Sequence, residues 1–164
     1  MNPQENPENL PQPSSQNPIE TQPLLYAGLI REITIIHQQF STRANQALKS
    51  LNLNFSQLSL LSHLMFLRTP ASITDLAEQM DLLQPAVTKM VQHLSEQGWI
   101  ELQPDPQDAR RKYIVLNDQG RMTFQQAQML LFPLLKEGFA GIEHLEASSM
   151  LGQLQHVRKN LAGR

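Results

Sequence analysis

The 164-residue chain contains no cysteine. This absence excludes disulfide frameworks, zinc sites built from thiolates and redox sensing through thiols. The chain also lacks a run of about 18 consecutive apolar residues, which a membrane-spanning helix requires. Its N-terminus has neither the basic region nor the apolar stretch of a secretion signal. These absences predict a cytoplasmic protein.

Motifs typical of enzymes are missing as well. The sequence has no glycine-rich phosphate loop and no convincing Ser-His-Asp arrangement. Its histidines form neither an HExxH motif nor a close ligand pair with acidic neighbours. These histidines are His37, His63, His93, His144 and His156. The sequence therefore predicts a protein that is not an enzyme and has no metal or other cofactor.

An excess of basic residues is also absent. The net charge is −2, although a protein that binds phosphates usually shows a basic footprint. Residues 1–23 contain three Glu and no Lys or Arg, so the remainder has 13 basic and 12 acidic residues. Such a nearly neutral body still permits a local basic patch, but it predicts weak non-specific affinity for DNA.

Composition divides the chain near residue 23. Residues 1–23 hold six of the eleven prolines, among Asn, Gln, Ser and Glu. This composition cannot bury enough apolar surface to offset the entropy lost on ordering. We therefore predict a disordered tail over residues 1–23 and one domain over residues 24–164.

Apolar stripes at both ends of that domain predict long helices. At the N-terminal end, apolar residues recur at steps of three and four. They are Leu25, Leu29, Ile33, Ile36, Phe40, Ala44 and Leu48. Leu24, Ile30 and Ile35 fall outside this stripe, and a second stripe runs through Leu151, Leu154, Val157 and Leu161. Because one core contact does not need so wide an apolar surface, we predict a partner chain.

Capping patterns in the middle of the chain predict two shorter helices. Asn54 precedes Gln57, and Ser72 precedes Asp75, by the spacing of a capping box. Each pair predicts a helix that starts at the residue directly after its cap, which is Asn54 in the first pair and Ser72 in the second. The second of these helices is only about two turns long.

A third helix follows after a tight turn. It is expected to begin near Gln84 and to end at Gly98. Val87, Val91 and Leu94 share its inner face, which leaves a polar outer face available for recognition. Two strands over residues 99–102 and 113–116 then predict a β-hairpin with a long basic tip.

These motifs together resemble the MarR (multiple antibiotic resistance regulator) family of winged helix-turn-helix transcriptional regulators. The resemblance rests on the runs 73–80 and 84–100 and on the hairpin, with an Asp-x-Arg motif at Asp108 and Arg110. It covers residues 54–120 closely. The outer helices agree with the family only in length and apolarity.

The resemblance implies a mainly α-helical fold with a small β-hairpin wing. A winged helix-turn-helix lobe over residues 52–120 would be flanked by dimerisation helices at residues 24–50 and 121–164. The family's activity implies a homodimeric repressor or activator that binds a pseudo-palindromic operator in double-stranded DNA, and we favour the repressor. Its recognition helices would enter successive major grooves, and its wings would enter the flanking minor grooves.

The expected DNA contacts follow from the resemblance and from side-chain chemistry. Polar groups near the start of a recognition helix reach base edges or phosphates. A wing can insert an arginine such as Arg110 into a narrow minor groove. The expected contacts are Gln84, Pro85, Ala86, Thr88, Lys89, His93, Asp108, Arg110, Arg111 and Lys112. Ordinary solvated surface is the alternative for each of them.

Two positions depart from the family pattern. Leu83 stands where the family usually has a serine that caps the recognition helix, and loss of such a cap costs about 1 kcal/mol. Lys89 is the only formal cation of that helix. Together with the nearly neutral charge, these departures leave open a second interpretation, a winged-helix module that binds protein instead of DNA.

The resemblance also implies a small-molecule effector, a small aromatic or other apolar anion. It would bind near the junction of the dimerisation and DNA-binding parts. The residues expected there are His37, Phe40, Arg43, Met65 and Phe66. Aromatic groups beside a cation suit an aromatic carboxylate, and purely structural roles are the alternative.

Overall fold

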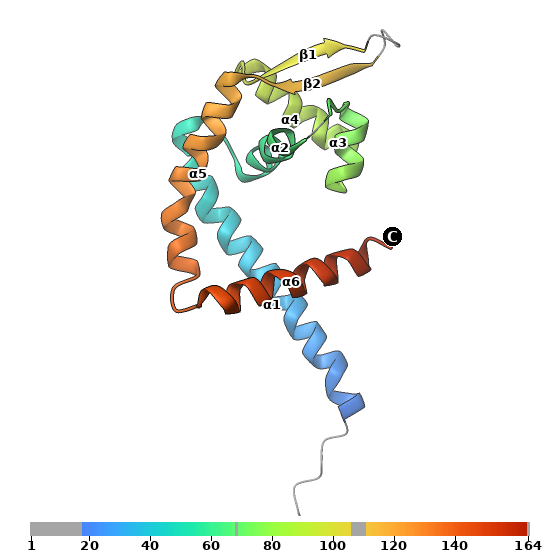
Figure 1. Ribbon diagram of the computed structural model, residues 1–164, viewed down its shortest axis with the longest axis vertical. Coiled ribbons are helices and arrows are strands. Elements are labelled where there is room, and N and C mark those ends of the chain that lie inside the picture. Colours follow the sequence, from blue (N-terminus) through green and yellow to red (C-terminus); the bar gives the residue numbers. More distant parts are fainter. Residues whose placement is uncertain (1–17, 68, 106–110, 164) are drawn as a thin grey trace, which may run out of the picture. The chain divides into compact units, whose positions relative to one another are not determined.

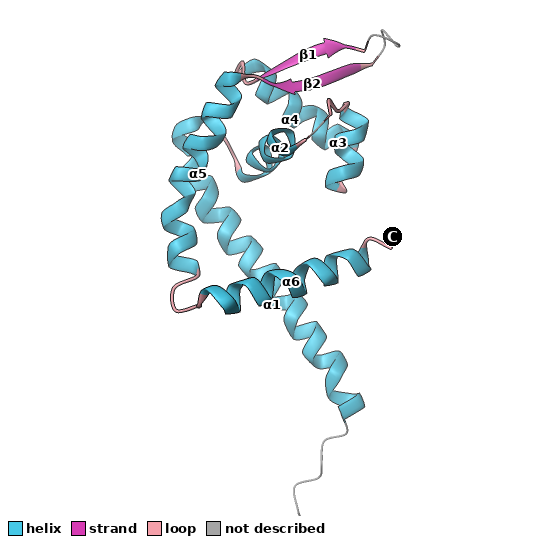
Figure 2. Cartoon of the chain, viewed as in Figure 1, coloured by secondary structure: helices cyan, strands magenta, loops and turns pink. Residues whose placement is uncertain are grey.

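The computed structural model describes residues 18–67, 69–105 and 111–163, and the side chains from residue 22 onward (Figure 1). Helices account for most of this part, and the two strands form one antiparallel hairpin (Figure 2). The elements are α1 (Pro18–Leu48), η1 (Lys49–Leu51), α2 (Phe55–Phe66), α3 (Ile73–Met80), α4 (Gln84–Glu96), β1 (Ile100–Pro104), β2 (Lys112–Leu116), α5 (Asp118–Gly138) and α6 (His144–Leu161). This arrangement confirms the predicted fold class.

The first helix starts earlier than its composition suggested. α1 begins at Pro18, so residues 18–23, which the composition assigned to the tail, belong to the helix. Pro18 stands in the first turn, where its missing N–H has no intrahelical partner to lose, and Pro23 lies inside the helix. Proline content therefore did not exclude a helix here. Residues 1–17 lie outside the described part of the chain.

The chain divides into two compact units, residues 1–40 and residues 41–164. In the first unit, none of the described side chains between residues 22 and 40 is buried. The large exposed apolar side chains are Leu24, Leu25, Tyr26, Leu29, Ile30, Ile33 and Ile36. The predicted stripe is thus exposed within this unit.

The second unit has an ordinary hydrophobic core. Its largest fully buried side chains are Leu48, Leu60, Leu61, Leu76, Val87 and Leu94. They come from the end of α1 and from α2, α3 and α4, so these helices share one core. The inward positions predicted for the third helix are all buried, together with Met90.

Local capping fixes where these helices start and end. The Asn54 and Gln57 side chains accept each other's backbone N–H at 2.9 Å, and Ser72 and Asp75 form the second capping box. Both predicted boxes are therefore confirmed. α3 ends at Asp81 in the left-handed conformation, and Gly98 has φ of +71° just after α4. The predicted end of the third helix at Gly98 is confirmed as well.

The hairpin packs against the helical core through its base. Ile100 pairs with Leu116, and the register continues to Pro104 opposite Lys112. Residues 106–110 of the hairpin tip lie outside the described part. Ile114 N–H also donates to the Ala71 carbonyl at 2.9 Å, which ties β2 to the segment just before α3. The wing base is therefore bonded to the helix-turn-helix through backbone.

The last two helices, α5 and α6, differ in how much of their surface is buried. α5 starts at Asp118, because the Asn117 side chain caps it by accepting from Gly120 N–H at 2.9 Å. Its N-terminal half has several buried side chains, whereas α6 has none. No helix in the described residues is long and apolar enough to cross a membrane.

Candidate nucleic-acid interface

The first turn of α4 is exposed and unusually apolar. Leu83 is the N-cap residue, but it has no side chain that can cap, and it is 79% exposed. Pro85 and Ala86 in the first turn are exposed as well. This end of the helix therefore offers apolar groups and backbone N–H groups, with no capping hydroxyl.

The polar side chains of the outer face of α4 lie in its first turns, after the N-cap residue. Gln84 donates through Nε2 to Thr74 Oγ1 at 3.3 Å, which links the two helices of the motif. The Thr88 hydroxyl donates back to the Gln84 carbonyl at 2.8 Å. Lys89 is exposed and has no ion-pair partner among residues 22–67, 69–105 and 111–163. Its ammonium group is thus available for a phosphate.

His93 is half-buried and contacts two other residues of the chain. Its Nε2 lies 2.8 Å from the Asn52 carbonyl oxygen, and its ring packs edge-on against Trp99 at a centroid distance of 6.1 Å. Because a carbonyl oxygen only accepts, Nε2 carries the proton in this contact. The arrangement gives His93 a role in joining α4 to the segment before α2, in addition to the DNA contact expected from sequence.

The wing residues divide into three groups. Asp108 and Arg110 lie outside the described residues, so their placement is not given. Lys112 is exposed, with no ion-pair partner in the described part of the chain. Arg111 is half exposed and turns toward α3, where Nη2 donates to Ser72 Oγ at 3.4 Å and lies 3.6 Å from Asp75 Oδ2. The neighbouring cations of the wing are therefore in different environments.

A second polar contact joins the two sides of the hairpin near its tip. The Tyr113 hydroxyl donates to Asp105 Oδ2 at 2.7 Å, and Asp105 N–H donates to the Arg111 carbonyl at 3.0 Å. The hydrogen bond to Asp105 raises the pKa of Tyr113, since the phenol must stay protonated to donate. Sequence reasoning missed this contact and the one from Arg111. No motif signals them, because both depend on the register of the hairpin.

The five residues expected to bind an effector are divided between the two units. His37 and Phe40 belong to the first unit, and the other three belong to the second. Arg43 donates two hydrogen bonds to the Glu137 carboxylate, one of them 3.0 Å long from Nη1 to Oε1. The guanidinium therefore already has an anionic partner within the chain.

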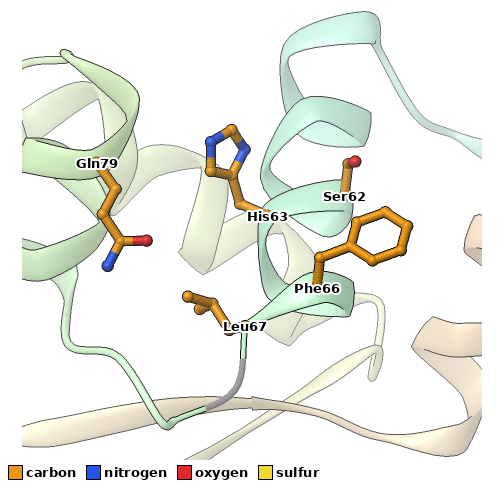
Figure 3. A pocket seen from close by; sticks show the side chains of 5 residues that line it. All are labelled: Ser62, His63, Phe66, Leu67 and Gln79. Atoms are coloured by element: carbon orange, nitrogen blue, oxygen red, sulfur yellow. The ribbon is translucent and has the colours of Figure 1, made fainter.

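Met65 and Phe66 both face α5. Arg121 donates through Nη1 to Met65 Sδ at 3.7 Å, and the Phe66 ring meets Phe124 edge-on at 6.2 Å between centroids. Phe66 is nevertheless 72% exposed. It lines an open pocket of about 300 Å³ with Ser62, His63, Leu67 and Gln79 (Figure 3). Of the five expected residues, only Phe66 lines this pocket.

Comparison with known sequences identifies the winged-helix segment. Residues 51–111 match the model of the MarR family. A relative from Bacillus subtilis (strain 168), the uncharacterized HTH-type transcriptional regulator YdgJ, is 26% identical over 106 residues. These residues make up 65% of this chain and 64% of the relative, so the match spans less than two thirds of that protein.

Solved structures share the fold. The transcriptional regulator BldR from Sulfolobus solfataricus matches with a TM-score of 0.74 and 23% identity, over 88% of this chain and 99% of that chain. A mutant MarR from E. coli, solved in complex with operator DNA, matches with a TM-score of 0.69 and 23% identity, over 79% of this chain and 93% of that chain. The chain therefore shares the fold of these solved structures, and its helix-turn-helix and wing segment, residues 51–111, is similar to the MarR family.

Proposed function

We propose that this protein is a homodimeric, sequence-specific DNA-binding repressor that responds to a small aromatic or other apolar anionic ligand. The observation that supports DNA binding most directly is the exposed outer face of α4 beside a hairpin wing. Gln84, Thr88 and Lys89 lie on that face. An exposed helix of this kind fits the major groove, and the wing next to it fits a flanking minor groove.

The dimer is supported by the uncovered apolar faces of the outer helices. α6 has no buried side chain, and large exposed apolar groups recur along it. They are Leu145, Met150, Leu151, Leu154, Val157 and Leu161. Contiguous apolar surface of this extent marks an association site. Two copies would place two recognition helices on a pseudo-palindromic site.

DNA binding can be tested with a labelled duplex that covers the region upstream of the protein's own gene. Fluorescence anisotropy should show saturable binding that weakens steeply with salt. Lys89→Gln should weaken binding and reduce the salt slope by about 1, as expected when one phosphate contact is lost. Lys159→Gln is the matched control, because it removes the same charge from α6.

Arg110→Ala tests the wing in the same assay. Loss of a minor-groove arginine should weaken binding by about 1–3 kcal/mol, while the circular dichroism spectrum stays unchanged. Equal affinities of variant and wild type at low salt would contradict the wing contact. Absence of any saturable binding by the wild type would contradict DNA binding itself and favour a protein-binding module.

Dimerisation is tested by sedimentation of Leu154→Glu. Because Leu154 is in the exposed stripe of α6, a charge there should shift the protein from dimer to monomer. Gln155→Glu adds the same charge one position away, outside the predicted stripe, and should leave the dimer intact. A dimer that persists in Leu154→Glu would contradict the role of this face.

A further inference from the structure

Arg111 is part of a small polar cluster at the start of α3. Ser72, the N-cap of α3, is buried and accepts from Arg111 Nη2 at 3.4 Å. Its hydroxyl in turn donates to Asp75 Oδ2 at 2.7 Å. Asp75 Oδ2 also accepts the Ser72 backbone N–H at 2.8 Å. The guanidinium therefore joins an existing capping box instead of projecting from the wing.

The charge of Arg111 is balanced within this cluster. Its Nη2 lies 3.6 Å from Asp75 Oδ2, and the two side chains are 49% and 38% exposed. The two hydrogen bonds from Ser72, and secondarily Arg111, lower the pKa of Asp75, so this carboxylate stays charged at neutral pH. A phosphate near Arg111 would gain one cation but would also meet this anion. Lys112, the next residue, has no such partner in the described part of the chain.

The cluster coincides with a backbone contact between the same two segments. The N–H of Ile114 donates to the Ala71 carbonyl. Ile114 lies three residues after Arg111, and Ala71 lies directly before Ser72. Asp105 N–H donates to the Arg111 carbonyl and joins the two sides of the hairpin near its tip. The side chain of Arg111 thus adds a second attachment between β2 and the start of α3.

We propose that Arg111 is a positioning residue, which holds the wing against the N-terminus of α3 through Ser72 and Asp75, and that it is not a direct DNA contact. This inference rests on the proposed DNA-binding function for its consequence, since the orientation of the wing determines where its tip meets the minor groove. The attachment itself exists in the DNA-free protein and is testable there.

The first test is amide hydrogen exchange of the DNA-free protein. In Arg111→Gln the N–H groups of Ile114 and Asp105 should exchange about two- to fivefold faster, the range that an exposed ion pair supports. Lys112→Gln removes a cation from the neighbouring position and should leave both rates unchanged. Unchanged rates in Arg111→Gln, or equal acceleration in the two variants, would overturn the proposal.

The second test uses the sign of an effect on DNA affinity. Removing an anion from a DNA-binding protein normally strengthens binding, because it lowers repulsion from phosphates. The proposal predicts the opposite for Asp75→Asn, a loss of about two- to fivefold. In an Arg111→Gln background the same substitution should have no further effect, because the attachment is already lost.

Other DNA affinities of the two single variants and the double variant would overturn the positioning role. Stronger binding by Asp75→Asn, together with a salt slope reduced by about 1 in Arg111→Gln, identifies Arg111 as a phosphate contact. Additive losses in the double variant attribute the Asp75 effect to the helix cap alone. If Asp75→Asn does not fold, the exchange rates of Arg111→Gln decide the matter. Failure of the wild type to bind DNA refutes the proposed function and leaves the exchange test valid.

Discussion

The guanidinium of Arg43 binds the carboxylate of Glu137 through two parallel hydrogen bonds, from Nη1 to Oε1 and from Nη2 to Oε2. The two residues are 94 positions apart and link the last turns of α1 to the end of α5. Both side chains remain at least half exposed. The pair is therefore accessible to solutes, and it couples two elements that flank the winged helix in sequence.

The pair should make stability depend on pH in the acid range. The hydrogen bonds and charge of Arg43 lower the pKa of Glu137 below its ordinary value of 4.5. A lowered carboxyl pKa stabilises the fold fully above 4.5, and this contribution is lost as the pH falls through the lowered value. Urea unfolding from about pH 6 down to about pH 3 should show the wild type converging on Glu137→Gln in that window only.

The matched control for this prediction is Glu101→Gln. Glu101 is an exposed carboxylate in β1 with no ion-pair partner in the described part of the chain. Its difference from the wild type should not change between the two ends of the pH range. A constant difference for Glu137→Gln as well would mean that the Arg43 contact does not persist in solution.

An effector with a carboxylate must compete with Glu137 for Arg43. Glu137→Gln should therefore bind a salicylate-like acid more tightly than the wild type, whereas Arg43→Ala should bind it more weakly. Isothermal titration with and without the operator duplex measures both effects. A tenfold change in DNA affinity on ligand binding requires about 1.4 kcal/mol of coupling. Identical ligand affinities in all three proteins would exclude Arg43 from the ligand site.

A hydroxyl at the start of the recognition helix should stabilise the protein. Leu83 has the extended backbone of an N-cap residue but no oxygen that can accept from the helix. Leu83→Ser should raise the free energy of unfolding by about 1 kcal/mol. Leu83→Ala removes the same exposed leucine without adding the oxygen, so the difference between the two variants isolates the cap. No difference between them would show that this helix start is satisfied in another way.

Close approach of α5 to Trp99 requires the glycine at position 120. A Cβ atom built there would overlap the Trp99 carbonyl oxygen and the Leu116 side chain. Gly120→Ala should therefore destabilise the protein by about 1–3 kcal/mol in urea unfolding. Gly152→Ala meets nothing within 4 Å, and it should stabilise α6 by up to about 1 kcal/mol. Equal effects of the two substitutions would contradict the packing of α5 against Trp99.

Contacts between residues close in sequence were predictable, and long-range contacts were not. Both capping boxes bring together residues three positions apart, so their spacing alone identifies them. His93 and Asn52 are 41 positions apart, and Arg111 and Ser72 are 39 apart. These two contacts depend on how the helices and the hairpin pack. Sequence reasoning therefore assigned His93 and Arg111 to DNA and could not identify their partners within the protein.

Helix boundaries show the same limit in a different form. The sequence contained the signal for the start of α5, since Asn117 is a good N-cap residue, but the resemblance placed the start of the C-terminal helices at residue 121. The start of α1 was missed because composition was averaged over a window that includes the first helical turn. In both cases the position of the helix start depended on one local residue and not on the average property of a segment.

Because α6 has no buried residue among its 18, we expect the proposed dimer to supply much of the stability of this helix. In proteins, most of the stability of a helix comes from the packing of its apolar face. Protein concentration then acts as a control variable: dilution favours chains with a melted C-terminus, and accumulation restores the helix. The amount of regulator in a cell would thereby set how much of it is folded, as well as how much of it is available.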